Sequence, residues 1–204
     1  MDKIDSLDKI NALVSDIRSL RKGYLTNFFL DRKKHSLWIE KGELFYVSFP
    51  DCYFLLHLTN SVNNLFFITT TSQQLAENLK AFLPIFAEQM VVDIVGDAKI
   101  VDLKDVFVEQ GFSVYEQLYR MNRIGTLEFK EIDTPNVCFA EDVDAQVVLD
   151  MLHSYFDPLS EQLPSYEEIL YFISQKSVLV YKEAGKVYGL SLIHISEPTR
   201  LALI

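Results

Sequence analysis

The sequence predicts an α/β (α+β) fold, with a mixed, mainly antiparallel central sheet flanked by helices. Short β-rich runs with short connections fill residues 37–70, which predicts a meander of antiparallel strands. Beyond residue 72, strand-like and helix-like segments alternate, as they do in sheets that helices cover. The 204 residues are 49% hydrophobic and 13% aromatic, which is ample material for a core.

The N-terminal segments come first. Residues 2–20 repeat apolar side chains at helical spacing, which predicts an amphipathic helix. Lys22-Gly23 is a typical stop signal after such a helix. Residues 24–30 are aromatic and leave a continuing helix and a loop open. The expected strands of the meander cover residues 37–39, 44–49, 53–58 and 65–70.

The segments after the meander alternate in type. Ser72 is expected to cap a helix whose apolar stripe reaches residue 86, and Pro84 predicts a kink or an early end. Gly111 is expected just past the end of another helix. The remaining expected elements are a strand at 90–95, that helix at 102–110, a long strand at 112–122, and a linker or edge strand at 125–136.

The second half of the chain starts a new set of elements. We expect a strand at 137–140, an acidic turn at 141–144, a helix at 145–154, a loop at 156–163, a helix from Ser165 and a hairpin at 177–189. Ser165 and Glu168 have the spacing of a capping box, in which each side chain satisfies a main-chain amide at the helix start. Ala184-Gly185 is expected to reverse the chain between the hairpin strands.

Composition and charge exclude several classes. A formal net charge of −10 argues against a nucleic-acid partner, because phosphate binding needs a basic face. No apolar run approaches the ~20 residues of a membrane span, and the N-terminus lacks the pattern of a signal peptide. We therefore expect a cytoplasmic protein that acts on neither nucleic acid nor membrane. Cys52 and Cys138 are expected to be free, buried thiols.

Single polar residues are assigned structural roles. His35, in the basic cluster at 32–35, is expected to be solvated, and His57 is expected on the polar face of a strand. His153 is expected to act at a helix end. Trp38 is expected in the core. No metal site is expected, because neither cysteine has a histidine at metal-ligand spacing.

One stretch carries a family resemblance. The order helix, antiparallel strands, helix, strand, helix, Gly111-Phe112 and strand resembles the GNAT superfamily of N-acetyltransferases over residues 53–123, most clearly in VFVEQGFSVYEQLYRMN. The family carries Arg/Gln-x-x-Gly-x-Gly/Ala between its fourth strand and the next helix, where backbone amides grip the pyrophosphate of acetyl-CoA. This chain has FFITTTSQQL there, without glycine. The resemblance implies a domain without cofactor-binding residues of the family kind.

Residues 137–189 resemble the opening of a second GNAT domain. In such enzymes the loop between the first two helices helps to shape the acceptor site, so the resemblance implies candidate substrate-binding residues at Tyr155, Phe156, Glu161 and Tyr166. Catalytic residues stay unassigned, because the strands that would carry them are expected beyond Gly189.

The last segment resembles something other than a protein family. LSLIHISEPTR, residues 190–200, resembles the translation of a sequencing-library adapter. Residues 201–204 would then be the translation of the adjoining index bases. The alternative is a real strand, since Leu190, Leu192 and Ile193 continue the hairpin pattern. We expect an N-terminal GNAT-like domain at 1–123, a linker at 124–136, a truncated second GNAT domain at 137–189 and a non-native tail at 190–204.

Two functions remain open. The first is a fragment of an acetyl-CoA-dependent N-acetyltransferase, whose parent acylates a small-molecule or protein amine and whose fragment is itself inactive and binds no cofactor. The second is a non-catalytic GNAT-like binding or regulatory protein, because a fold does not fix an activity. The sequence leaves the oligomeric state open.

Overall fold

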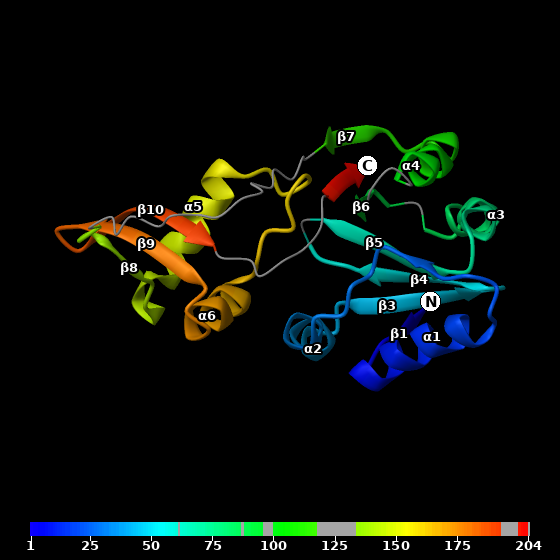
Figure 1. Ribbon diagram of the computed structural model, residues 1–204, viewed down its shortest axis with the longest axis horizontal. Helices are drawn as coiled ribbons and strands as arrows, with labels where there is room; N and C mark the ends of the chain where they lie inside the picture. The colour runs from blue at the N-terminus through cyan, green and yellow to red at the C-terminus, as the bar shows by residue number, and fades with distance from the viewer. Residues whose placement is uncertain (61, 87, 96–99, 118–133, 193–199, 204) are drawn as a thin grey trace, which may run out of the picture. The chain divides into compact units, whose positions relative to one another are not determined.

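A computed structural model describes all residues except 61, 87, 96–99, 118–133, 193–199 and 204 (Figure 1). The chain divides into two compact units, which are considered separately. Unit 1 is Met1–Tyr119 with Pro198–Ile204, and unit 2 is Arg120–Glu197. The predicted α+β class and the mixed, mainly antiparallel sheet are confirmed. The long strand expected at 112–122 lies partly outside the described residues, as does most of the linker expected at 124–136.

The sheet of unit 1 is built around an antiparallel meander. Its path runs β1 (Asp2–Lys3), β3 (Leu44–Phe49), β4 (Cys52–His57), β5 (Asn63–Thr69), β6 (Met90–Val95), β11 (Arg200–Leu203) and β7 (Val114–Gln117), with β2 (Leu25–Thr26) also on β5. The strands of the β3–β4–β5 meander pair antiparallel, as predicted. β5 and β6 pair in parallel, and the connection between them contains α3 (Ser72–Phe82).

Helices cover both faces of this sheet (Figure 1), and a hydrophobic core lies on each face. One core packs under α3 and α4 (Ile100–Glu109), and the other under α1 (Leu7–Ser19) and α2 (Arg32–Lys41). Residues of β5 alternate between them, because successive side chains of a strand point to opposite faces. Burial on both faces explains why β4 and β5 read as nearly continuous apolar runs.

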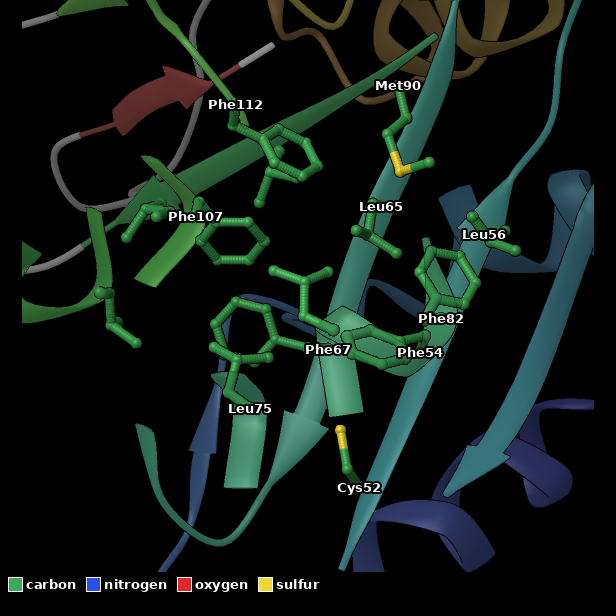
Figure 2. Packing of buried hydrophobic residues seen from close by; sticks show 14 residues of the cluster. Cys52, Phe54, Leu56, Leu65, Phe67, Leu75, Phe82, Met90, Phe107 and Phe112 are labelled. Carbon is green, nitrogen blue, oxygen red and sulfur yellow. The ribbon is translucent and has the colours of Figure 1, made fainter. Parts of the chain in front are cut away.

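Aromatic rings fill the core under α3 and α4 (Figure 2). The ring centroids of Phe54 and Phe82 lie 4.7 Å apart, and those of Phe107 and Phe112 lie 5.2 Å apart, edge to face. Gly111, with φ +95°, follows α4 as predicted and lets Phe112 turn back onto Phe107. The Gly111-Phe112 pair therefore ends a helix and anchors its end in the core.

The N-terminal prediction was wrong at the start of the helix and in its stop signal, although its predicted last residue, Leu20, is the C-cap of the observed helix. α1 begins at Leu7, because the Ser6 side chain accepts a hydrogen bond from the Lys9 amide and caps the helix. Residues 2–3 instead form β1 on β3. The helix ends at Ser19, with Leu20 as its C-cap, so Gly23 is not its stop signal. Residues 25–26, left open between helix and loop, form the short strand β2.

The strand expected at 37–39 was also wrong, because these residues lie within α2. The Asp31 side chain accepts from two amides at the start of α2, and Gly42, with φ +73°, ends it. These caps outweigh the β preference of a three-residue run. α2 places Trp38 in the core, as predicted.

His35 is buried, contrary to the prediction that it is solvated, whereas His57 lies in a strand, as predicted, but is buried as well. His35 is 3% exposed, contacts the rings of Phe28 and Trp38, and accepts a hydrogen bond from the Asp31 amide at Nδ1. His57 is 8% exposed and stacks on Trp38 with 3.7 Å between ring centroids. Its Nε2 lies 3.2 Å from Glu43 Oε2. The sequence missed this cluster because residues 37–39 of α2 were predicted as a strand.

Unit 2 has helices on one face of a three-stranded sheet. The sheet order is β10 (Lys186–Leu192), β9 (Val178–Glu183) and β8 (Val137–Phe139), all antiparallel. A short 3-10 turn (Asp142–Asp144) leads into α5 (Ala145–Tyr155), and α6 (Tyr166–Ser174) follows. Apolar residues of α5, α6 and β9 form one core. The order of elements is the predicted one.

Local signals in unit 2 are confirmed, with one correction. Ser165 and Glu168 form the predicted capping box, and Ala184 and Gly185 have the positive φ angles of a tight hairpin turn. Cys138 is exposed, not buried, because it lies on the edge strand β8. Residues 190–192 continue β10 and pair with 178–180. That 190–204 is non-native stays a prediction, because strand pairing does not report the origin of a sequence.

The buried His35 predicts a stability that falls with acid. Burial, with the charge of Lys34 as the second cause, lowers the pKa of His35 from 6.5 to about 3. The unfolded chain therefore binds a proton below pH 6.5 that the folded chain does not, so the free energy of unfolding drops as the pH falls. The slope is up to about 1.4 kcal/mol per pH unit.

We expect the unfolding free energy, followed by Trp38 fluorescence in urea, to fall by about 1 kcal/mol more in the wild type than in His35→Asn between pH 7 and 5.5. The asparagine side chain can still accept a hydrogen bond from the Asp31 amide, but it binds no proton between pH 7 and 5.5. His153→Asn, at an exposed position, should keep the wild-type slope. Equal slopes for wild type and His35→Asn would contradict the prediction.

Candidate functional site

The place where β5 and β6 part is the candidate site of unit 1. These parallel strands pair at their amino ends, Asn63 with Met90 and Asn64 with Val91. Toward its carboxyl end, the same edge of β5 pairs with β2 instead. In open sheets, ligands bind outside the carboxyl ends of parallel strands. α3 also begins there, with the partial positive charge of a helix N-terminus. This region is called the β5–β6 parting below.

The side chain of Asn27 fills the β5–β6 parting. Its Nδ2 donates to the carbonyl of Leu65 on β5 at 3.2 Å and to that of Asp93 on β6 at 2.9 Å. Its Oδ1 accepts from the amide of Phe67 at 2.7 Å. Asn27 is buried, so these bonds are shielded from water. One carboxamide thus pairs with main-chain groups that an extended, amide-bearing ligand would otherwise use.

The rest of the β5 edge is also satisfied by the chain itself. Thr26 Oγ1 donates to the carbonyl of Phe67 at 2.5 Å, and Leu25 pairs with Thr69. Gly23 brings this segment close, because a Cβ on it would lie 2.5 Å from the carbonyl oxygen of Thr70. Only glycine fits that approach, and its φ of +118° favours glycine as well. The absence of a side chain at residue 23 therefore lets the chain close over the end of β5.

The hydroxyls at the start of α3 are mostly used internally. Thr69 Oγ1 donates to the carbonyl of Asp51, and Thr71 Oγ1 accepts from the amide of Gln74, so Thr71 and not Ser72 is the N-cap. Thr70 Oγ1 is buried and has no hydrogen-bond partner within the described part of the chain. Each threonine carries a Cβ where a glycine loop would expose bare amides.

A buried cysteine lies near the end of β5, on the strand that pairs with its other edge. Cys52 on β4 is opposite Thr69 and fully buried. Burial raises the pKa of its thiol to about 12, although a hydrogen bond with Thr69 partly offsets the rise. The thiolate is the reactive form of cysteine, and it is therefore scarce at neutral pH.

The four predicted substrate residues of unit 2 lie around the loop between α5 and α6. Tyr155 is the last residue of α5 and 77% exposed, Phe156 is its C-cap, and Tyr166 is the first residue of α6. Glu161 lies within the loop, is partly buried, and donates its amide to the carbonyl of Asp157. The structure thus places exposed aromatic rings at both ends of this loop, with the carboxylates of Asp157 and Glu161 in the chain between them.

A shallow hollow of about 240 Å³ lies elsewhere in unit 1, where α3 and α4 end and β6 begins. It is lined by Leu83, Phe86, Glu88, Gln89, Met90, Gln110, Gly111 and Phe112. Its residues are mainly apolar, and a helix end and its closing turn form one wall. This composition is that of a surface depression over the core, with Glu88 as its one titratable side chain.

The described residues hold neither a cluster of metal-ligating side chains nor a membrane-spanning helix. Within them, no three His, Cys, Asp or Glu side chains gather as ligands for a metal ion. No helix among them is long and apolar enough to cross a bilayer. No protein-family model matches the chain, and no curated protein matches it. The family resemblance therefore stays a prediction.

Sequence reasoning missed Asn27, the residue that defines this site. The available signal was a single carboxamide within the aromatic run YLTNFFL, because a polar side chain among apolar neighbours becomes buried and must find partners. Which partners it finds depends on the parting of two strands from other parts of the chain. The sequence does not show that parting.

Asn27→Ala tests how much this bridge contributes. The substitution leaves three buried main-chain groups without their partner, so we expect a loss of about 3 kcal/mol in the free energy of unfolding. Urea unfolding followed by Trp38 fluorescence measures it. Asn63→Ala is the matched control, because its carboxamide bonds to Glu88 and Gln89 at an exposed position. A loss no larger than that of the control would show that the bridge is dispensable.

Proposed function

We propose that this chain is part of a tandem GNAT-like N-acetyltransferase in which unit 1 is a non-catalytic copy. The order of elements in unit 1 supports the resemblance: two helices, an antiparallel meander, α3, β6, α4 with its Gly111-Phe112 ending, and β7. The parallel β5–β6 pair within a mainly antiparallel sheet fits the same arrangement.

The filled β5–β6 parting is the observation that carries the non-catalytic role. A cofactor held in the family manner would need bare amides at the start of α3, and threonine side chains occupy that turn. The β5 edge beside it is already paired with Thr26 and Asn27. A ligand would have to displace buried hydrogen bonds, each of which is costly to leave unmade.

Acyl transfer would then belong to the second unit. In this chemistry an amine nitrogen attacks the acetyl carbonyl carbon and loses its proton to a carboxylate or an ordered water. Main-chain amides stabilise the oxyanion, and the thiolate of coenzyme A leaves with a proton. The loop bounded by Tyr155, Phe156 and Tyr166, with Glu161 within it, is proposed to contact the amine-bearing acceptor. The catalytic groups are proposed to lie on strands that follow residue 189.

A second candidate is a non-catalytic binding or regulatory protein. The self-filled β5–β6 parting favours it for unit 1, because a site closed by its own chain suits a scaffold better than an enzyme. The two candidates differ only in the second unit, so the tests below address the two units separately.

The 204-residue chain should not bind acetyl-CoA. Titration calorimetry is expected to show no saturable heat up to about 1 mM, the upper end of ordinary substrate affinities. Acetylation of a panel of amines, followed by release of free thiol, should not exceed the rate without protein. Saturable binding, or turnover above that background, would refute the non-catalytic role of unit 1.

Reading the undisturbed genomic locus past the codon of Gly189 tests the second unit. We expect a further strand and then a glycine loop of the Arg/Gln-x-x-Gly-x-Gly/Ala kind before the next helix. Such a loop favours the acetyltransferase. An open reading frame that continues without a glycine loop would leave the binding or regulatory protein as the better candidate.

A further inference from the structure

Trp38 of α2 contacts two histidines in different ways. The ring of His57, the last residue of β4, stacks on it with an interplanar angle of 8° and 3.7 Å between ring centroids. The ring of His35 meets it at 74°, with 4.8 Å between ring centroids. All three side chains are buried. This group of three rings joins α2 to the end of β4 and is called the Trp38 clamp below.

The His57 side of the Trp38 clamp favours a protonated imidazole. A cation gains from the electron-rich face of a tryptophan, and the gain is larger where water is excluded. Glu43 Oε2 lies 3.2 Å from His57 Nε2, so a carboxylate is in place to accept from the charged ring. The Glu43 amide donates to the carbonyl of Trp38, and its carbonyl accepts from the amide of Leu58. Main-chain bonds therefore hold Glu43 beside His57 whatever the charge of the ring.

The His35 side of the Trp38 clamp favours a neutral imidazole. Its Nδ1 accepts a hydrogen bond from the Asp31 amide at 3.0 Å, and a protonated nitrogen has no lone pair to accept with. Burial, with the charge of Lys34 as the second cause, lowers the pKa of His35 to about 3. Acid therefore weakens the contacts of His35, at a much lower pH than that at which an ordinary histidine gains its charge.

The other groups around His57 decide between these tendencies. Leu44 on β3 and Asn64 on β5 lie opposite His57 in the sheet, and both are uncharged. Lys34 Nζ lies 4.9 Å from the centroid of the Trp38 ring, so it opposes a second cation on that ring. Glu43 contacts His57 directly, and Coulomb interactions weaken with distance. The contact with Glu43 therefore outweighs the charge of Lys34.

We propose that the Trp38 clamp is a pH-sensitive device, in which protonation of His57 tightens the attachment of α2 to the sheet. The clamp also acts on the segment that fills the β5–β6 parting. Phe28 follows Asn27 in that segment, and its ring contacts the ring of His35 with 4.5 Å between centroids. Mild acid thus holds this segment in place through α2. This device goes beyond the proposed function and does not depend on it.

Unfolding of His57→Gln in urea tests the tightening. Glutamine can still donate to Glu43, but it takes up no proton between pH 7.5 and 5.5. A group that binds a proton more tightly in the folded chain stabilises that chain as the pH falls. At a fixed urea concentration, we expect the ratio of unfolded to folded protein, from circular dichroism, to rise about fivefold more in His57→Gln than in the wild type over this range. An equal or smaller rise would overturn the proposal, because burial would then keep His57 neutral.

The emission of Trp38, the single tryptophan, reports the charge of His57 in the folded protein, because a stacked imidazolium quenches an excited indole. Without urea, we expect the emission to fall by about half between pH 7.5 and 5.5 in the wild type and in His35→Asn, but not in His57→Gln. Unchanged circular dichroism over this range confirms that the chain stays folded. Constant emission in the folded wild type would overturn the proposal.

Glu43→Gln keeps the proposal testable if His57→Gln does not fold, since Glu43 is only partly buried. The variant removes the carboxylate charge and keeps a hydrogen-bond acceptor. We expect the midpoint of the emission change to move to lower pH by about half a unit, a modest shift because water screens the pair. Glu40→Gln, at an exposed position of α2, is the matched control and should leave the midpoint unchanged. A midpoint that Glu43→Gln moves no further than the control does would overturn the proposal.

Discussion

The structure of unit 1 depends on one requirement. The edge of β5 that faces away from β4 must be hydrogen-bonded along its length. β5 is buried on both faces, so water cannot satisfy its main-chain groups. β6 serves the amino end, Asn27 and Thr26 serve the middle, and β2 serves the carboxyl end. The segment between α1 and α2 therefore pairs with β5 through β2 and bonds to β5 and β6 through Asn27. The place where a ligand would pair with the sheet is the place where the chain pairs with itself.

The same logic recurs at the next edge. β6 is as buried as β5, and a strand that follows unit 2 in the sequence completes its other side. Unit 1 thus has two interior edges that are filled by short segments, one through a side chain and one through a strand. A carboxamide and a strand satisfy the same kind of main-chain groups. The first arrangement closes a possible ligand site.

Prediction succeeded where the information is local. The strands β3, β4 and β6, the capping box of Ser165, the hairpin turn at Ala184-Gly185 and the end of α4 at Gly111 follow from short patterns with a direct physical cause. It failed at α2, where the β preference of 37–39 was weaker than the caps at Asp31 and Gly42. The burial of His35 and His57 was not predicted either, since it depends on α2 lying against β4.

The sequence by itself determined the α+β class, the antiparallel meander, the order of elements in unit 2 and the absence of glycine before α3, because periodicity, capping and turn chemistry act over a few residues. Only the tertiary structure decided that Asn27 bridges β5 and β6, that His57 stacks on Trp38, and that residues 200–203 lie between β6 and β7. Each of these joins segments far apart in the chain. Their partners are main-chain groups and aromatic ring faces. Such groups occur throughout the chain, and no sequence pattern indicates which of them will pair.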